Sequence, residues 1–178
     1  MSEPPDILRL DAARARAAVP ELADVLVDCV AGGASVNFMA PYTQAEAEAF
    51  FAKVADSVER GETALIAARL DGRILGTVQL GLDTPPNQPH RADVKKMLVH
   101  RSARRRGVGA AVLAEAERWA AELGRTLLVL DTAEGEAGEH LYASQGWIRV
   151  GVIPDYALMP EGGFCGAVFF YKRTAPPP

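Results

Sequence analysis

The sequence is poor in disulfide-forming and metal-binding side chains. Its 178 residues include two cysteines, Cys29 and Cys165, and three histidines, His90, His100 and His140. Two cysteines without Cys-x-x-Cys spacing cannot build a disulfide framework or a redox motif, and the histidines lack metal-ligand spacing. We therefore expect buried thiols, surface imidazoles and no metal ion.

The sequence also lacks long apolar runs and a surplus of positive charge. No apolar run approaches the ~18 residues of a membrane-spanning helix. The N-terminus carries acids and prolines where a secretory signal needs basic and apolar segments. The net charge of -4 argues against nucleic-acid binding as the main role. We expect a cytoplasmic protein with no membrane or nucleic-acid partner.

What is present suffices for one hydrophobic core. A length of 178 residues with 49% hydrophobic residues is typical of a single domain. No internal repeat divides the chain, and its end is rich in proline. We predict one domain over residues 1–178, with an unstructured tail at 174–178.

The first half of the chain predicts two helices followed by a hairpin. Pro20 suits the first turn of a helix that ends at Gly32, and Thr43 with Glu46 forms a capping box for a helix that ends at Gly61. The apolar runs 63–70 and 73–82 are joined at Asp71-Gly72, which favours a tight turn between antiparallel strands.

The second half alternates strands and helices. We expect strands at 92–100, 126–130, 147–152 and 164–172, with helices at 107–123 and 136–145. A strand, a helix and a further strand in succession imply a parallel pair of strands.

The most informative segment is a basic, glycine-containing turn. Arg104-Arg105-Arg106-Gly107-Val108-Gly109 follows a strand and opens a helix, where free backbone N–H groups and the helix dipole attract an anion. Glycine allows close approach of phosphate oxygens, and arginine pairs with phosphate charge. The segment predicts a pyrophosphate site, although a solvated turn that caps the helix is the alternative. It is neither a Walker loop nor a dinucleotide fingerprint.

Two motifs resemble the GNAT superfamily of acetyltransferases. They read MLVHRSARRRGVGAAVL at 97–113 and LYASQGW at 141–147. Segments 32–40, 91–94 and 130–132 further resemble the tabtoxin-resistance acetyltransferases. The resemblance implies an α/β fold with a central mixed, mostly antiparallel sheet, a splayed parallel strand pair and helices on both faces.

The resemblance also implies acetyl-CoA as the acetyl donor, without a metal. Acetyl-CoA would lie between the strands that end near Val99 and Asp131, with the backbones of Leu98 and Val99 bonding its pantetheine. The pyrophosphate would be held by Arg104, Arg105, Arg106, Gly107, Val108, Gly109 and Ala110. Many relatives have an asparagine where this chain has Gly135, so a coenzyme contact there is not expected.

The resemblance identifies Tyr142 as the general acid for the leaving thiolate, with helix-to-sheet packing as the alternative role. Removal of a proton from the incoming amine needs a base, for which Asp131 and Asp93 are the candidates. Asp131 could equally cap the end of its strand. Asp93 lies some distance along its strand from the thioester region and could act through water or bind substrate.

The loop 33–42 is expected to cover the acceptor pocket, with Ser35, Asn37 and Phe38 as substrate contacts. Three functions stay open: acetylation of a small-molecule amine, including a toxin of the tabtoxinine-lactam type; acetylation of a protein N-terminus or lysine; and binding of acyl-CoA as a sensor. Many relatives pair through their C-terminal region, so a homodimer is expected, and Ala167–Tyr171 could form either a central strand or that interface.

Overall fold

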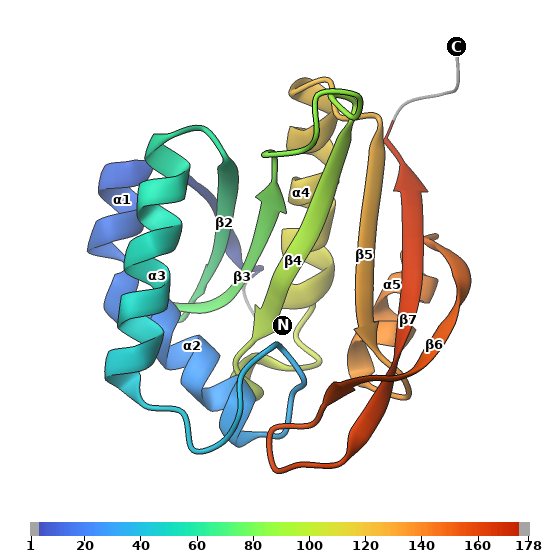
Figure 1. The fold of residues 1–178 in the computed structure, drawn as a ribbon. Coiled ribbons are helices and arrows are strands. Elements are labelled where there is room, and N and C mark those ends of the chain that lie inside the picture. The colour runs from blue at the N-terminus through green and yellow to red at the C-terminus, as the bar shows by residue number, and fades with distance from the viewer. Residues whose placement is uncertain (1–3, 175–178) are drawn as a thin grey trace.

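The computed structural model describes residues 4–174 and contains one seven-stranded sheet with the strand order β1-β2-β3-β4-β5-β7-β6 (Figure 1). In chain order the elements are β1 (Asp6–Leu10), α1 (Ala12–Ala17), α2 (Val19–Ala31), α3 (Gln44–Glu59), β2 (Thr63–Leu70), β3 (Arg73–Gly81), β4 (Arg91–Val99), the 3-10 turn η1 (Arg101–Ala103), α4 (Val108–Glu122), β5 (Leu127–Ala133), α5 (Ala137–Ser144), β6 (Ile148–Leu158) and β7 (Phe164–Arg173).

Local signals set the ends of the first elements. Pro20 lies in the first turn of α2, and Thr43 and Glu46 form the expected capping box at the start of α3. At the β2–β3 turn, Asp71 and Gly72 have φ values of 53° and 77°, which a tight two-residue hairpin turn requires. These sequence predictions are confirmed.

The sheet is antiparallel except at β4 and β5. These two strands pair in parallel over Arg91–Asp93 and Leu127–Val129 and then separate, so the sheet splits toward their carboxyl ends (Figure 1). The predicted mixed, mostly antiparallel sheet with one splayed parallel pair is therefore confirmed.

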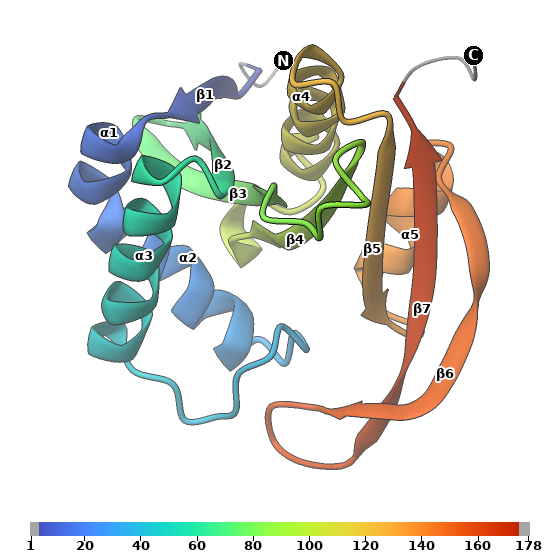
Figure 2. The same ribbon diagram turned by 45° about the horizontal axis from the view of Figure 1, so that its top comes forward.

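Helices cover both faces of the sheet, because the side chains of each strand alternate between two buried clusters. Helices α1 to α3 pack on one face against residues that include Leu65 and Leu98. Helix α4 and the Tyr142 turn of α5 pack on the other face against residues that include Ile66 and Leu128 (Figure 2). Gly76 of β3 allows α4 to lie close, since a Cβ at this position would come within 2.4 Å of Val108.

Two strands are longer than the sequence suggests. Strand β5 continues to Ala133, which pairs with Ala167, and β6 continues to Leu158, which pairs with Phe164. Both extensions form because β7 pairs with each strand. The polar residues within the extensions interrupt the apolar pattern, so the sequence did not indicate that the strands continue. Asp131 therefore lies inside β5 and not at its end.

The end of the chain is ordered as far as it is described. Thr174, expected within the unstructured tail, bonds through its N–H and hydroxyl to the carbonyls of Thr126 and Arg125. The rest of that predicted tail, 175–178, lies outside the described residues. Among residues 4–174, no helix is both long and apolar enough to cross a membrane.

Candidate active site

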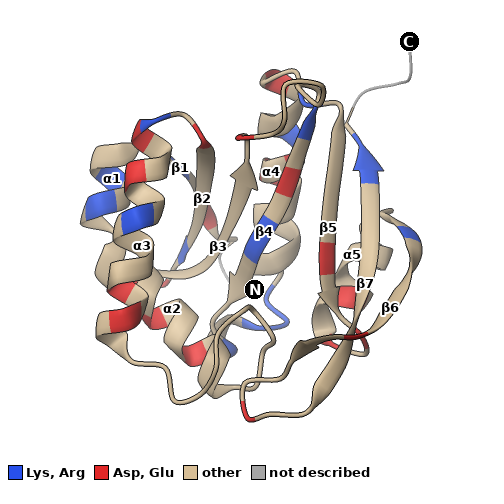
Figure 3. Ribbon diagram, viewed as in Figure 1, with Lys and Arg blue, Asp and Glu red and all other residues tan. Residues whose placement is uncertain are grey.

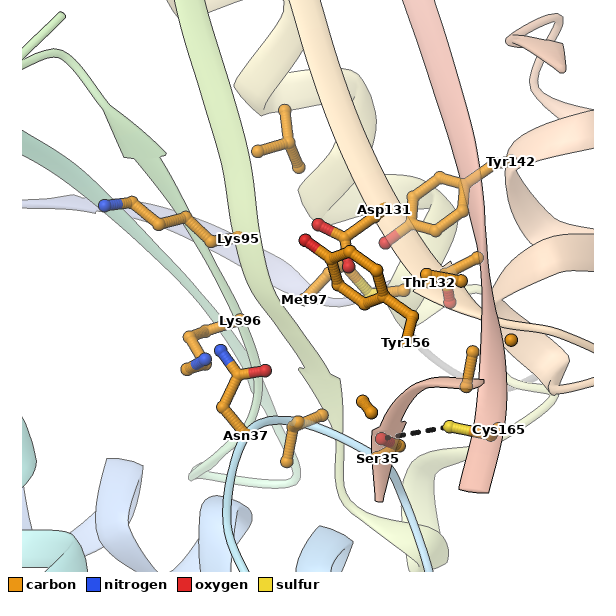
Figure 4. Close-up of a pocket in the computed structure, with 16 residues that line it drawn as sticks. Ser35, Asn37, Lys95, Lys96, Met97, Asp131, Thr132, Tyr142, Tyr156 and Cys165 are labelled. Carbon is orange, nitrogen blue, oxygen red and sulfur yellow. Dashed lines mark hydrogen bonds between the residues drawn. The ribbon is translucent and has the colours of Figure 1, made fainter. Parts of the chain in front are cut away.

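The gap between β4 and β5 opens into a pocket with a volume of about 130 Å³ (Figure 4). Its walls come from segments far apart in the sequence: residues 35–37 of the α2–α3 loop, 94–97 of β4, 131–133 of β5, 142 of α5, 156–157 of β6 and 165–167 of β7. Acidic, basic, hydroxyl and apolar groups thus meet where the sheet splits, as ligand sites commonly do at strand carboxyl ends.

A bulge in β4 shapes one wall of the pocket. Thr77 pairs with Leu98 but Gln79 pairs with Lys95, so β4 holds one residue more than β3 over this stretch. Lys96 sits in the bulge with a φ of 50°. The bulge turns this part of β4 toward the pocket.

The register decides which backbone groups face the gap. The N–H of His100 bonds to the carbonyl of Leu75 at 2.9 Å, so by alternation Leu98 directs its N–H and carbonyl toward β3, while Met97 and Val99 face the open edge. The buried Leu98, expected to bond pantetheine, is therefore less suited to this contact than Met97. Val99 remains suited to it.

The N-terminus of α4 fits an anionic group. No side chain within residues 4–174 caps this helix, whose cap residue Gly107 has a φ of 79°. Arg105 is also left-handed, with a φ of 60°. The first intrahelical bond runs from the N–H of Ala111 to the carbonyl of Gly107, so the N–H groups of Val108, Gly109 and Ala110 have no partner within the helix. The loop and the helix end thus offer a set of hydrogen-bond donors to an anion.

The three arginines of this loop differ in their surroundings. Arg104 and Arg105 are exposed, whereas Arg106 forms an ion pair with Asp71 of the β2–β3 turn at 2.9 Å. Gly109 has a packing role, because a Cβ there would lie 3.1 Å from Leu141 of α5. Of the three guanidinium groups, those of Arg104 and Arg105 are thus the most accessible to a phosphate.

Tyr142 lies at the back of the pocket. Its side chain is 5% exposed and packs against Trp147 and Phe170, with ring centroids 5.7 and 5.9 Å away. Its hydroxyl points toward Asp131 (Figure 4). Burial, followed by the Asp131 charge, raises the pKa of Tyr142 well above its usual value, so the phenol keeps its proton. Packing and proton donation are compatible roles for this residue.

The structure separates the two candidate bases. Asp131 lines the pocket, and although solvent reaches its carboxylate, partial burial raises the pKa of this group. Asp93 forms an ion pair with Arg91 and lies outside the pocket lining. Of the two candidate bases, Asp131 is therefore the one that lies at the pocket.

The α2–α3 loop closes the pocket from the other side of the gap. Ser35 and Asn37 line the pocket, as expected, and the Ser35 hydroxyl donates to the carbonyl of Leu158 at 3.4 Å. The N–H of Ala40 bonds to the carbonyl of Pro160 at 2.9 Å. Phe38 instead packs against α3, 5.2 Å from Phe50 between ring centroids, so its position is behind the pocket wall.

Several pocket residues escaped the sequence reasoning. Lys96 and Tyr156 line the pocket, and Cys165, expected to be buried, is half-buried and faces it. Two adjacent lysines within an apolar strand were a sequence signal that could have indicated Lys96. Tyr156 and Cys165 reach the pocket on the β6–β7 hairpin, and no sequence signal indicated them. Gly135 forms a left-handed turn whose N–H bonds to Glu139 at 2.9 Å, which explains a glycine there. Within the described residues, no group of three or more acidic, histidine or cysteine side chains could hold a metal ion.

The gap in the sheet thus has an uncapped helix N-terminus on one side and a pocket with acidic, basic and hydroxyl side chains on the other. Residues 33–147 match the sequence profile of the acetyltransferase (GNAT) family, and the chain belongs to this family.

Solved structures agree on the fold. A crystal structure of an N-acetyltransferase from Staphylococcus aureus Mu50 has a TM-score of 0.80 at 17% identity, over 97% of this chain and 100% of that one. A ribosomal-protein-alanine N-acetyltransferase from Brucella melitensis has a TM-score of 0.77 at 21% identity, over 94% and 99%. A Salmonella typhimurium structure, described as an acetyltransferase with its cofactor acetyl-CoA, has a TM-score of 0.76 at 14% identity, over 97% and 95%.

Proposed function

We propose that this chain is an N-acetyltransferase that moves the acetyl group of acetyl-CoA to a primary amine of a small molecule by direct attack. The observation that carries the proposal is the β4–β5 gap, which joins the uncapped N-terminus of α4 to a pocket that contains Tyr142 and Asp131.

In this proposal, different residues along the gap bind different parts of acetyl-CoA. Acetyl-CoA supplies the activated acetyl group when bound. The N–H groups of Gly107 to Ala110, with Arg104 and Arg105, hold the pyrophosphate, and Val99 bonds the pantetheine arm. The N–H of Met97 polarises the carbonyl under attack.

Two protons have to move. Asp131, directly or through water, takes the proton that the ammonium loses, and the free amine forms the new C–N bond. Tyr142 donates its proton to the sulfur as the C–S bond breaks, and regains a proton from solvent. The raised pKa of Tyr142 means that the phenol is protonated at neutral pH and has a proton to donate.

The acceptor class rests on the pocket. A pocket volume of about 130 Å³ suits a compact amine. The resemblance to tabtoxin-resistance acetyltransferases makes a tabtoxinine-lactam type of toxin the first acceptor to test, and detoxification the corresponding role. The cytoplasmic location and the homodimer stay predictions from the sequence.

A protein acceptor is the second candidate, because the β6–β7 hairpin, which forms part of the pocket wall, exposes large apolar side chains. Tyr156, Leu158 and Phe164 are 52%, 45% and 70% exposed, which would suit an extended peptide. Mass spectrometry of peptides incubated with acetyl-CoA distinguishes this acceptor from a small amine.

Thiol release from acetyl-CoA with a panel of small amines tests the proposed function. We expect turnover with at least one amine. We also expect Tyr142→Phe to lower kcat by about 100-fold or more, because a positioned proton donor contributes about 10²–10⁴-fold. The affinity for acetyl-CoA should not change, since the ring remains in place.

Tyr171→Phe, on the neighbouring strand β7, is the matched control and should keep wild-type turnover. Binding of acetyl-CoA without thiol release for any amine or peptide would contradict an enzyme and favour a sensor of acyl-CoA.

A further inference from the structure

Two opposite charges face the same pocket from opposite sides of the split sheet. Lys96 lies in the β4 bulge and Asp131 on β5, and both residues line the pocket. Figure 3 shows the basic segment of β4 across the gap from an acidic position on β5. The left-handed conformation of Lys96 directs its side chain toward Asn37 of the closing loop (Figure 4).

Neither charge is neutralised by the described part of the protein. The ammonium of Lys96 lies 5.4 Å from the ring centroid of Phe38 and takes part in no ion pair or hydrogen bond within residues 4–174. Within the same residues, the carboxylate of Asp131 forms no ion pair, and the two side chains do not pair with each other.

Both charges are also partly shielded from water. Burial lowers the pKa of Lys96 and the neighbouring Lys95 lowers it further, whereas burial raises the pKa of Asp131. The attraction between Lys96 and Asp131 across the pocket offsets part of each shift. A partly buried charge is stabilised further by an opposite charge at hydrogen-bond distance. Neither side chain has such a partner within residues 4–174, and a ligand that carries both charges can supply one to each.

The charges of the acceptor determine whether both Lys96 and Asp131 gain an oppositely charged partner. An acceptor that carries only an amine would meet Asp131 but leave Lys96 facing another positive charge. An acceptor with an anion a few bonds from its amine would satisfy both groups, with the Asn37 amide beside the anion.

We propose, on the basis of the proposed function, that the acceptor is a zwitterion, a small primary amine with a carboxylate or similar compact anion, and that Lys96 binds this anion. Lys96 is thus a specificity-determining residue of the acceptor pocket. A protein N-terminus, which has an amide in place of the nearby carboxylate, would be a poor acceptor.

Matched acceptors test the charge requirement. The panel contains α-amino acids such as lysine, ornithine and glutamine, each with its carboxamide and its decarboxylated amine, and kcat/KM is measured by thiol release. We expect the free amino acids to exceed their carboxamides by about tenfold or more, the contribution of one charge-assisted hydrogen bond.

Variants at two lysines, one inside the pocket and one outside it, assign the effect to Lys96. Lys96→Met should abolish the preference by lowering kcat/KM only for acceptors with a carboxylate, and Lys96→Arg should restore part of it. Lys53→Met removes the same charge from an exposed position on α3, outside the pocket lining, so the preference should persist.

The outcomes separate the two proposals. Acetyl transfer without a carboxylate preference, or an equal loss for all acceptors in Lys96→Met, overturns the zwitterion proposal and leaves the acetyltransferase in place. Transfer to peptides in preference to free amino acids also overturns it. No transfer to any amine contradicts the proposed function, and the zwitterion proposal with it.

Discussion

Asp131 is a carboxylate held where water only partly solvates it. The strand around it is apolar, with Leu130 buried before it and Ala133 buried two residues after it. Burial raises the pKa of Asp131, and Lys96 offsets part of this effect. A base for an incoming ammonium benefits from such an environment, because its affinity for a proton rises toward that of the group it must deprotonate.

Replacement of this carboxylate should separate activity from stability. Since the folded-state pKa of Asp131 is raised, the folded protein binds more protons than the unfolded chain, and the ionised side chain lowers the unfolding free energy at neutral pH. Asp131→Asn should therefore lower kcat/KM by about 100-fold while slightly raising the Tm at pH 7.

The pH dependence of the Tm distinguishes this effect of Asp131→Asn from a general gain in stability. The gain in Tm should disappear as the pH falls below the ordinary aspartate pKa of about 4, where both states are protonated. Thermal unfolding of both proteins from pH 3 to pH 8 measures this, and a lower Tm for the variant at pH 7 would contradict the assignment.

The positions of several site residues could be predicted from the sequence. Tyr142, Asp131, Ser35 and Asn37 meet in one pocket, as the motifs and the loop predicted, although their roles stay predictions. Lys96 was missed because a bulge changes which way a strand residue points, and strand alternation in the sequence cannot reveal one inserted residue.

Among the connections between elements, the β3–β4 loop depends on one distant side chain. Arg125, between α4 and β5, donates to the carbonyls of Leu82, Pro89 and Arg91 and to the hydroxyl of Thr84, at 2.7 to 3.2 Å. This guanidinium fixes the start of β4 beside β5, next to the three residue pairs that hold the parallel strands together.

Arg125→Met should destabilise the fold through this loop. Loss of a charged donor that serves several backbone carbonyls costs about 2–3 kcal/mol, which lowers the Tm by about 4–10 °C for a protein of this size. Arg14→Met, at an exposed site 3.9 Å from Asp11, is the control and should leave the Tm unchanged. Equal Tm values for both variants in calorimetry would refute the role of Arg125.

Element types could be predicted more reliably than element lengths. The capping box at Thr43 and the Asp71-Gly72 turn are local signals, and the structure confirms both. The extensions of β5 to Ala133 and of β6 to Leu158 depend on pairing with β7, which lies far along the chain from β5. Such pairing cannot be read from a short sequence window.

At the scale of the whole molecule, the gap between β4 and β5 divides the sheet into two parts. The parts are joined by the short parallel pairing and by contacts of the α2–α3 loop with the β6–β7 hairpin, including the bond from Ala40 to Pro160. A ligand that fills the gap contacts both parts and should stabilise the folded state as a whole.

Acetyl-CoA should therefore raise the Tm. At a free concentration 100 times its Kd, binding adds about 2.7 kcal/mol, which corresponds to a rise of about 5–10 °C. Pantetheine, which lacks the pyrophosphate, should give a much smaller rise at equal concentration. Equal shifts for the two compounds would show that the N-terminus of α4 is not the anchor.

The ion pair between Arg106 and Asp71 would matter at the end of the proposed reaction cycle. A coenzyme phosphate that reached this guanidinium, beside the proposed contacts of Arg104 and Arg105, would compete with Asp71 for it. Because the acetylated and the spent coenzyme carry the same phosphates, the competition would weaken the binding of both to the same extent. An internal carboxylate that recaptures Arg106 would then shorten the residence time of the product.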